Sequence, residues 1–582
     1  MKRANIGPFA GILGGSLAAI AIVAGLLPNY WVFLCTTAVI SAVTLQSVGV
    51  VTGRTGMISL CQMSFAGIGA WTVAWLNVHG APGSLPLWIL IGGLVAVPFG
   101  VTIGLPALRL RGINLAVVTL GFAAAFDNVL GAMTFPGQAQ FKFVPRPLLF
   151  SGDRAYFAFC VIVFALIALA LYLLSRSRFG AAWMAIRHSE RATAAHGVSI
   201  PRSKVSAFAL SAFIAGIGGG LLAGQLGTLV SGSFDIMQSL ALFVLGTMVG
   251  AQHGDGALLG GILTAFFPEL LRRLHLPQDL GNIAFAVGAI QALSMGASSS
   301  EALRTLLWRR RARRLRRQPS SARTAIAPGP AAMPGTIFPG GHGPAPALDI
   351  AGLTVRYGSV VALDRVDLKV AAGAVVGLIG PNGAGKSTLI DAVTGFVNRY
   401  DGALMLEGCG LDGLAAHRRA LVGVRRTWQQ TRIAPDLTVG GYVRLAAGRR
   451  LSGGELAQIL DWLGCPDPEE RIAAIDVGTR RLLDIAGVVA ARPRAIFLDE
   501  PAAGQSHEES MRLALRIAEI PARFGSAVVL VEHDIDLVRR ACSQVTVLDF
   551  GQVIASGPPD RVLGEEAVIK AYLGAAQEGL TV

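Results

Sequence analysis

A glycine-rich segment, GPNGAGKST at positions 380–388, has the residue types and spacing that hold the phosphates of a nucleotide. An apolar run at 374–379 precedes it and a helical pattern follows it, which is the strand, loop and helix order that a phosphate-binding loop requires. The glycines let backbone N–H groups close around phosphate oxygens, and Lys386 is expected to reach the β- and γ-phosphates. We therefore predict that nucleotide is bound by Gly380, Pro381, Asn382, Gly383, Ala384, Gly385, Lys386, Ser387 and Thr388.

Two further predicted strands end in side chains suited to hydrolysing a phosphoanhydride bond. The run RAIFLDEP ends in Asp499 and Glu500. Asp499 and the Ser387 hydroxyl are expected to hold Mg²⁺, and Glu500 to polarise the attacking water as a general base. The run AVVLVEHD places His533 where it would reach the γ-phosphate. Together with the glycine-rich loop, these residues predict ATP hydrolysis with ATP and Mg²⁺ as cofactors.

The elements around this chemistry are of two kinds. The chain has 582 residues, of which 53% are hydrophobic and 15% charged, and this balance argues against an ordinary soluble multidomain enzyme. A helix needs about 20 apolar residues to cross a bilayer. Candidate spans lie near 10–28, 30–51, 57–78, 86–105, 112–132, 155–174, 205–227, 238–252, 256–271 and 280–296.

If both termini are cytoplasmic, the loops between these spans place Arg54, Arg109, Arg111 and the basic run from Arg176 to Lys204 in the cytoplasm, as positive-inside bias requires. Arg272 and Arg273 fall on the outer side in this scheme. We expect eight to ten transmembrane helices, because the spans near 238 and 256 are short and rich in glycine. Two carboxylates, Asp127 and Glu269, lie within or beside the spans. Each is either a functional group or a helix-end carboxylate that is paired or faces water.

The fold class that follows is an all-α membrane permease followed by an α/β P-loop ATPase. We predict a transmembrane domain over 1–303, a linker over 304–347 and a nucleotide-binding domain over 348–582. The linker begins with an arginine cluster and continues with proline, glycine and alanine, which is typical of a flexible tether. Its arginines are better placed to contact membrane lipid than nucleic acid, because aromatic residues are scarce among them.

The first half resembles the permeases of branched-chain amino acid ABC importers. Four segments carry the resemblance in order: TGRTGMISLCQMSFAGIGAWT, LPALRLRGINLAVVTLGFA, SRFGAAWMAIRHSE and LGTMVGAQHGDGALLGGILTAFFPELL. The resemblance spans roughly 36–275 and implies that the segment from Glu190 to Gly197 is a coupling helix that docks on an ATPase. The alternative is a basic loop that only sets topology.

The second half resembles the ATPase subunit of the same importers over nearly all of 348–574. Within LTVRYGSVVALDRVDL, Tyr357 matches the aromatic residue that stacks on adenine. Within RRTWQQTR, Gln429 matches the catalytic glutamine that senses Mg²⁺ and contacts the coupling helix, and Gln430 is one register away.

The signature sequence of ABC ATPases is where this resemblance is weakest. A literal LSGGE runs from Leu451 to Glu455, but it comes too early in the chain and reads as a helix start with Ser452 as its N-cap. The signature position is instead occupied by IDVGTRRLLDIAGVVAARP at 475–493. There the resemblance aligns a degenerate signature of Asp476, Val477, Gly478 and Thr479, in which a carboxylate replaces the serine that faces the partner's γ-phosphate.

The resemblance implies a half-importer, a permease and an ATPase in one polypeptide of the bacterial inner membrane. The implied partners are a second permease, a second ABC ATPase and a periplasmic solute-binding protein, with membrane lipid around the helices and no nucleic acid. The family transports branched-chain amino acids, small amides, urea and aromatic acids. Two other readings remain open: an ABC exporter, and a membrane regulator that uses nucleotide binding as a switch.

Overall fold

A computed structural model of the chain describes residues 6–110, 112–139, 141–277, 279–295 and 346–578. The chain divides into two compact units. The first unit consists of Met1–Trp183 with Pro201–Ile326, and the second of Met184–Ile200 with Ala327–Val582. The segment 184–200, which interrupts the first unit in the sequence, therefore packs with the second. The predicted linker lies almost entirely outside the described residues.

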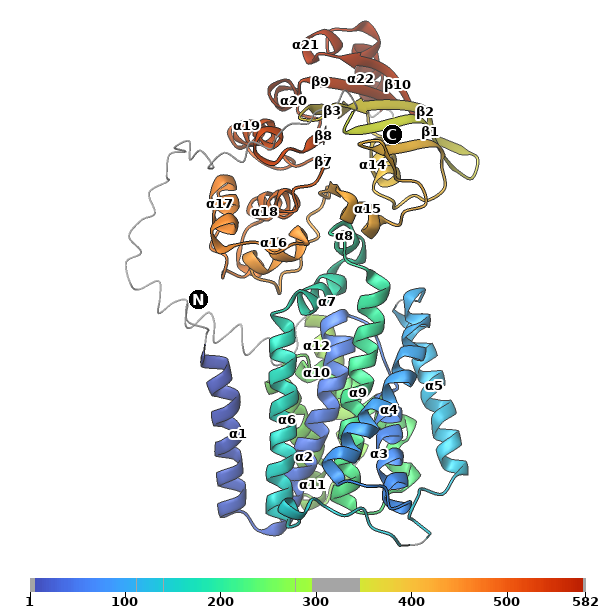
Figure 1. Ribbon diagram of the computed structural model, residues 1–582, viewed down its shortest axis with the longest axis vertical. Helices are drawn as coiled ribbons and strands as arrows, with labels where there is room; N and C mark the ends of the chain where they lie inside the picture. Colours follow the sequence, from blue (N-terminus) through green and yellow to red (C-terminus); the bar gives the residue numbers. More distant parts are fainter. Residues whose placement is uncertain (1–5, 111, 140, 278, 296–345, 579–582) are drawn as a thin grey trace, which may run out of the picture. The chain divides into compact units, whose positions relative to one another are not determined.

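All the long secondary-structure elements described in the first unit are helices (Figure 1). Among the described residues, seven segments are long and apolar enough to cross a membrane: Asn29–Arg54, Leu85–Gly104, Ile113–Ala132, Asp153–Ser175, Ile200–Leu226, Ser231–Val249 and Gly254–Arg273. Each of the predicted spans corresponds to one helix of the unit: α1 (Ile6–Leu26), α2 (Asn29–Val48), α3 (Gln62–Val78), α4 (Leu85–Gly104), α5 (Ile113–Ala132), α6 (Asp153–Ser175), α9 (Ile200–Leu226), α10 (Ile236–Val249), α11 (Gly254–Arg273) and α12 (Asp279–Met295).

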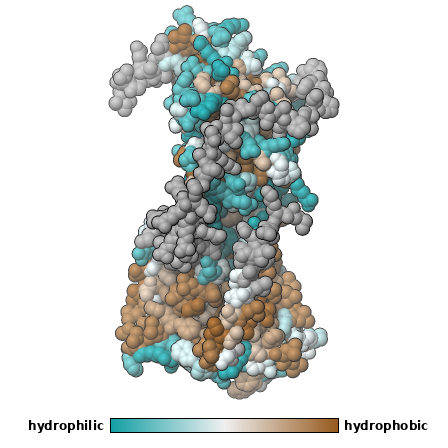
Figure 2. Space-filling view, turned by 90° about the vertical axis from the view of Figure 1, so that its left-hand side faces the viewer, coloured by the Kyte–Doolittle hydropathy of each residue, from teal (hydrophilic) through white to brown (hydrophobic). Residues whose placement is uncertain are grey.

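Glycines bring the backbones of these helices together. A Cβ atom on Gly219 of α9 would lie 1.8 Å from the carbonyl oxygen of Ala66 on α3, and one on Gly261 of α11 would lie 2.1 Å from that of Ala38 on α2. Such close approach is how helices pack when lipid supplies no hydrophobic drive. Figure 2 shows broad hydrophobic areas on the outside of this unit, a surface suited to hydrocarbon.

The carboxylate of Glu269, near the end of α11, is paired. Its two oxygens accept hydrogen bonds from Arg272 Nε at 2.9 Å and Arg273 Nε at 2.8 Å. Glu269 is thus a helix-end ion pair, the simpler of its two predicted roles.

The second unit contains two sheets. The antiparallel sheet has the order β2-β1-β4-β5, formed by β1 (Leu348–Tyr357), β2 (Val360–Val370), β4 (Asp401–Leu406) and β5 (Cys409–Gly410). The larger sheet has the order β10-β9-β3-β8-β7-β6, formed by β3 (Val375–Ile379), β6 (Val424–Arg426), β7 (Ala495–Asp499), β8 (Ala527–Val531), β9 (Gln544–Asp549) and β10 (Gln552–Gly557).

The strands β9, β3, β8, β7 and β6 are parallel, so their carboxyl ends meet at one edge of the larger sheet. Every residue of β3, β7 and β8 is buried, as expected for parallel strands covered on both faces. Ligands of open α/β sheets bind at this edge. The glycine-rich loop and the predicted catalytic side chains all follow these strands.

Helices pack around the sheets (Figure 1). They are α14 (Lys386–Val393), α15 (Ala416–Val422), α16 (Val439–Ala447), α17 (Gly453–Leu463), α18 (Val477–Ala490), α19 (His507–Phe524), α20 (Ile535–Ala541), α21 (Pro559–Val562) and α22 (Glu566–Glu578). Of these, α16 and α17 both pack on α18, and the three form a separate helical layer. The segment 184–200 adds the end of α7 (Arg178–His188) and the whole of α8 (Glu190–Ala195), which contacts α15.

Candidate functional site

The glycine-rich loop connects β3 to α14 and needs its glycines. Gly380 and Gly385 have φ angles of 149° and 102°, and a Cβ on them would lie 2.0 Å from the carbonyl oxygen of Leu548 and 2.7 Å from that of Ala362. A larger residue at either position would therefore clash as well as strain the backbone. The loop runs from Gly380 to Gly385 through Pro381, Asn382, Gly383 and Ala384, and Lys386, Ser387 and Thr388 form the first turn of α14.

The Lys386 ammonium lies over this loop. Its Nζ donates hydrogen bonds to the carbonyl oxygens of Gly380 at 2.6 Å and Pro381 at 2.9 Å, and the side chain is buried. Burial lowers the pKa of Lys386, and the carboxylates of Glu500 and Asp499 oppose that fall. The amine thus shares one electrostatic environment with both carboxylates.

The Glu500 carboxylate contacts both of the other predicted catalytic residues, Gln429 and His533. Its Oε1 lies 3.1 Å from His533 Nε2, and its Oε2 accepts a hydrogen bond of 2.8 Å from Gln429 Nε2. The three residues follow β7, β8 and β6, three strands that end at the same edge. Because a carboxylate only accepts hydrogen bonds, His533 must carry its proton on Nε2. Each oxygen keeps a further lone pair for a water molecule.

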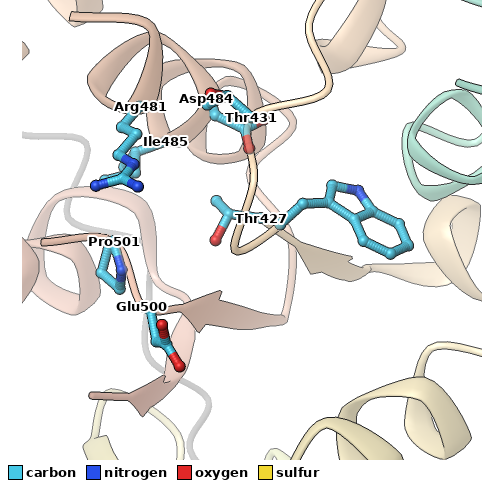
Figure 3. A pocket seen from close by; sticks show the side chains of 8 residues that line it. Thr427, Thr431, Arg481, Asp484, Ile485, Glu500 and Pro501 are labelled. Carbon is cyan, nitrogen blue, oxygen red and sulfur yellow. The ribbon is translucent and has the colours of Figure 1, made fainter. Parts of the chain in front are cut away.

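The backbone at Glu500 has a φ of 47°, which is unusual for a residue with a side chain. Its amide donates to the carbonyl oxygen of Val531 on β8 at 2.9 Å, so the turn is held by the neighbouring strand. Figure 3 shows a pocket lined by Glu500 and Pro501, by Thr427 and Thr431, and by Arg481, Asp484 and Ile485 of α18.

Asp499 is buried at the end of β7 and held from two sides. Arg426 Nη2 donates to its Oδ2 at 3.2 Å, and its own amide donates to Thr427 Oγ1 at 3.1 Å. Burial raises the pKa of Asp499, and the Arg426 guanidinium acts against that rise. With Ser387 and Gln429, Asp499 offers a hydroxyl, an amide and a carboxylate oxygen, which are the ligand types that Mg²⁺ prefers.

Tyr357 stands at the end of β1 with 53% of its surface exposed, so its ring is accessible for stacking. Its contact with adenine stays a prediction.

The predicted degenerate signature begins α18. Asp476 is the N-cap: its Oδ1 accepts from the Thr479 amide at 2.8 Å, and its Oδ2 accepts from Thr479 Oγ1 at 2.6 Å. These hydrogen bonds lower the pKa of Asp476, so the carboxylate is charged at neutral pH. Val477 is 62% exposed next to it, and Gly478 follows.

The LSGGE segment has a different place. Ser452 accepts a hydrogen bond of 3.1 Å from the Glu455 amide and caps α17, which confirms the predicted N-cap. The Glu455 carboxylate binds Arg449 and Arg492, with the latter at 2.9 Å. The segment therefore serves the local structure of α17.

The predicted coupling segment belongs to the second unit. Ala192 and Ala195 of α8 pack on Trp428, and Arg425 Nη1 donates to the carbonyl oxygen of Ala195 at 3.1 Å. Gly197 has a φ of 77°, and a Cβ there would lie 3.0 Å from Leu421 Cδ2 of α15. Glu190 is the first residue of α8, and the preceding Ser189 is its N-cap, with a side chain that accepts a hydrogen bond from the Ala192 amide.

Sequence reasoning missed a chain of charges between α8 and the catalytic edge. Arg426 also forms an ion pair with Asp391 of α14, and the other oxygen of Asp391 lies 3.9 Å from Arg191 of α8. Arg425 and Arg426 are 4% and 3% exposed. Two adjacent arginines inside an otherwise strand-like segment were the available signal, because arginine is almost never fully buried unless paired.

Comparison with known protein families gives three matches along the chain. Residues 30–287 match a family described as "Branched-chain amino acid transport system / permease component". Residues 363–503 match "ABC transporter", and residues 552–578 match "Branched-chain amino acid ATP-binding cassette transporter". The permease match covers the first half of the chain, and the other two cover the parts that carry the phosphate loop and the C-terminal strand and helices.

Individual relatives match the second half. The chain is 34% identical over 252 residues to the high-affinity branched-chain amino acid transport ATP-binding protein BraF of Pseudomonas aeruginosa, a match to 40% of this chain and 99% of that protein. It is 32% identical over the same length to LivG of Escherichia coli, with the same coverage. The Fe(3+) ions import ATP-binding protein FbpC of Streptomyces avermitilis is 33% identical over 237 residues, with 67% of its length covered.

Proposed function

The chain belongs to the branched-chain amino acid ABC transporter family, with a permease and an ATPase in one polypeptide, and we propose that it forms half of an importer. In this proposal, residues 1–303 are the permease and 348–582 the ATPase domain, in the bacterial inner membrane with the ATPase in the cytoplasm. The solutes are branched-chain or other hydrophobic amino acids. Its partners are a second permease, a second ATPase and a periplasmic solute-binding protein.

One observation carries the proposal: a segment of the permease half, α8, packs on the unit that contains the catalytic edge. Hydrolysis at that edge and movement of the permease are thereby linked within one chain. A lipid-anchored ATPase without a transport task would not need this contact.

Hydrolysis follows from the groups around Glu500. Its carboxylate is fixed by Gln429 and His533 and takes the proton of the attacking water. Lys386 neutralises phosphate charge at the loop. The Nε2 proton of His533, which faces Glu500 here, would be donated to the γ-phosphate instead when ATP is bound. Mg²⁺, held by Ser387, Asp499 and Gln429, would neutralise the charge that develops on the phosphates.

The charged carboxylate of Asp476 supports a further proposal about the two ATP sites. In this family each site joins one chain's phosphate loop to the other chain's signature. This chain's loop would complete a competent site with an intact partner signature, whereas the partner's nucleotide would face a negative charge. We therefore propose a heterodimer with one main hydrolytic site.

Uptake of labelled leucine tests the importer. Deletion cells are complemented with this chain or its Lys386→Ala form, and the uptake is competed with small amides and aromatic acids. Uptake restored only by the intact chain supports import and ranks the solutes. Retained uptake with Lys386→Ala would contradict the proposal, and efflux of a preloaded solute would indicate an exporter. Nucleotide binding without transport in either direction would indicate a regulator.

A further inference from the structure

Three buried polar side chains connect α8 to the helical layer of the second unit. His196 follows α8, Tyr442 lies on α16 and Asp484 on α18, and each is 3% exposed. The Tyr442 hydroxyl donates to Asp484 Oδ1 at 2.6 Å and lies 3.2 Å from His196 Nε2. The two rings meet edge to face, with 5.5 Å between their centroids.

The direction of these hydrogen bonds is fixed by chemistry. A carboxylate offers no proton, so the Tyr442 hydroxyl proton goes to Asp484. His196 must then donate from Nε2 to the hydroxyl oxygen. Burial, helped by the nearby Arg425 guanidinium, lowers the pKa of His196 to about 3, so its ring is neutral at physiological pH. Both donors therefore point toward Asp484, and each bond polarises the next.

The position of Tyr442 depends on a glycine in the middle of α18. A Cβ on Gly487 would lie 2.9 Å from Tyr442 Cε1 and 2.9 Å from Ala446 Cβ. Glycine inside a helix lowers its stability relative to alanine. Helix α18 is therefore less stable at Gly487 than it would be with alanine, and the space that a side chain would fill there is occupied by the ring of Tyr442.

The same end of α8 is held by its backbone. Arg425 binds the carbonyl oxygen of Ala195, and the left-handed turn at Gly197 brings the chain against Leu421. These contacts would accept many sequences at position 196, because they involve backbone atoms or residue 197. Only the hydrogen bond from His196 requires a particular side chain there.

We propose that His196, Tyr442 and Asp484 form a docking latch, through which this ATPase recognises an α8 that ends in a hydrogen-bond donor and couples it to α18. The inference rests on the proposed importer function, in which α8 transmits movement to the permease. In a heterodimer with two permeases and two ATPases, the latch favours pairing of this ATPase with the α8 of its own chain.

A direct test measures amide hydrogen exchange of the full chain in detergent, which needs neither partners nor transport. Tyr442→Phe keeps the ring and removes the hydroxyl, and His196→Leu removes the donor. One buried neutral hydrogen bond changes an opening equilibrium by about five- to tenfold. We expect exchange of residues 189–197 to accelerate by that factor in His196→Leu and by at least that factor in Tyr442→Phe, which also leaves the Asp484 carboxylate without its donor. The double variant should exchange no faster than Tyr442→Phe.

Two more variants separate a latch from general damage. His196→Gln places an N–H near the position of Nε2 and should keep the protection. Trp462→Phe removes a comparable bond, from the indole Nε1 to Glu519 at 2.8 Å, in the same helical layer and should leave 189–197 unchanged. Unchanged exchange in both Tyr442→Phe and His196→Leu, or fully additive effects in the double variant, would overturn the latch.

Transport measurements then address its role. In the assembled importer, Tyr442→Phe should lower uptake per ATP hydrolysed, while Trp462→Phe keeps the wild-type ratio. A wild-type ratio in Tyr442→Phe, despite faster exchange, would overturn the coupling part of the proposal. An intact chain that takes up no solute would refute the importer itself, and the exchange data would still decide whether the latch exists.

Discussion

Replacing Arg426 with methionine should lower both the stability of the second unit and its rate of ATP hydrolysis. The guanidinium lies between two carboxylates, Asp499 of β7 and Asp391 of α14, and is 3% exposed. Methionine retains much of the side chain's volume but none of its charge or hydrogen bonds. Asp499, which is 7% exposed, then loses the only ion pair that it forms among the described residues.

The size of the effect follows from that burial. Breaking a buried ion pair by removing one partner costs about 3–5 kcal/mol, because the remaining charge is left without compensation. For a domain of this size, each kcal/mol shifts Tm by about 2–4 °C, so we expect a fall of roughly 6–20 °C. Displacement of Asp499 by even about 1 Å should also lower ATP hydrolysis by up to about 100-fold at saturating Mg²⁺.

Thermal unfolding in detergent and ATPase assays in membranes measure the two effects. Arg512→Met is the matched control, because its ion pair with Glu508 joins side chains that are 68% and 83% exposed. Such pairs contribute about 0–1 kcal/mol, so the control should shift Tm by less than about 4 °C. Arg426→Lys keeps the positive charge but lacks the planar guanidinium, so its Tm should lie between those of the wild type and Arg426→Met. An Arg426→Met protein with wild-type Tm and hydrolysis would refute the reasoning.

Three further predictions concern α17 and α18. Asp476→Asn keeps the N-cap of α18 and removes its charge, so nucleotide should bind the partner's site at least about five times more tightly. Nucleotide binding to the assembled importer measures this, and unchanged affinity would argue against charge repulsion as the cause of the asymmetry between the two sites. Ser452→Ala should cost about 1 kcal/mol in thermal stability and leave hydrolysis unchanged, whereas loss of hydrolysis would give LSGGE a catalytic role. Burial raises the pKa of Asp484 from 3.8 to about 6, so ionisation destabilises the fold as pH rises through this interval. Asp484→Asn should therefore stabilise by about 3 kcal/mol at pH 7.5 and by about half as much at pH 5, and an advantage that did not shrink with acidity would contradict the assignment.

Much of this protein is determined by local sequence patterns. A run of apolar residues is itself the condition for a membrane helix, so the helices of the first unit were predicted within a few residues. The glycines at 380, 383 and 385 identify the phosphate loop because only glycine fits its backbone. Ser452 was recognised as an N-cap for an equally local reason: its side chain bonds the amide three residues later.

The tertiary structure decided what depends on contacts between distant segments. The convergence of Gln429, Glu500 and His533 requires three strands to end at one edge, and a sequence shows strand ends without showing their order in a sheet. Arg426 is paired and buried only when β6, β7 and α14 come together, and the chain from His196 to Asp484 forms only when the end of α8 meets α16 and α18. Their polar groups are stable there because each meets a partner from another segment, and a linear sequence does not reveal which side chain that partner is.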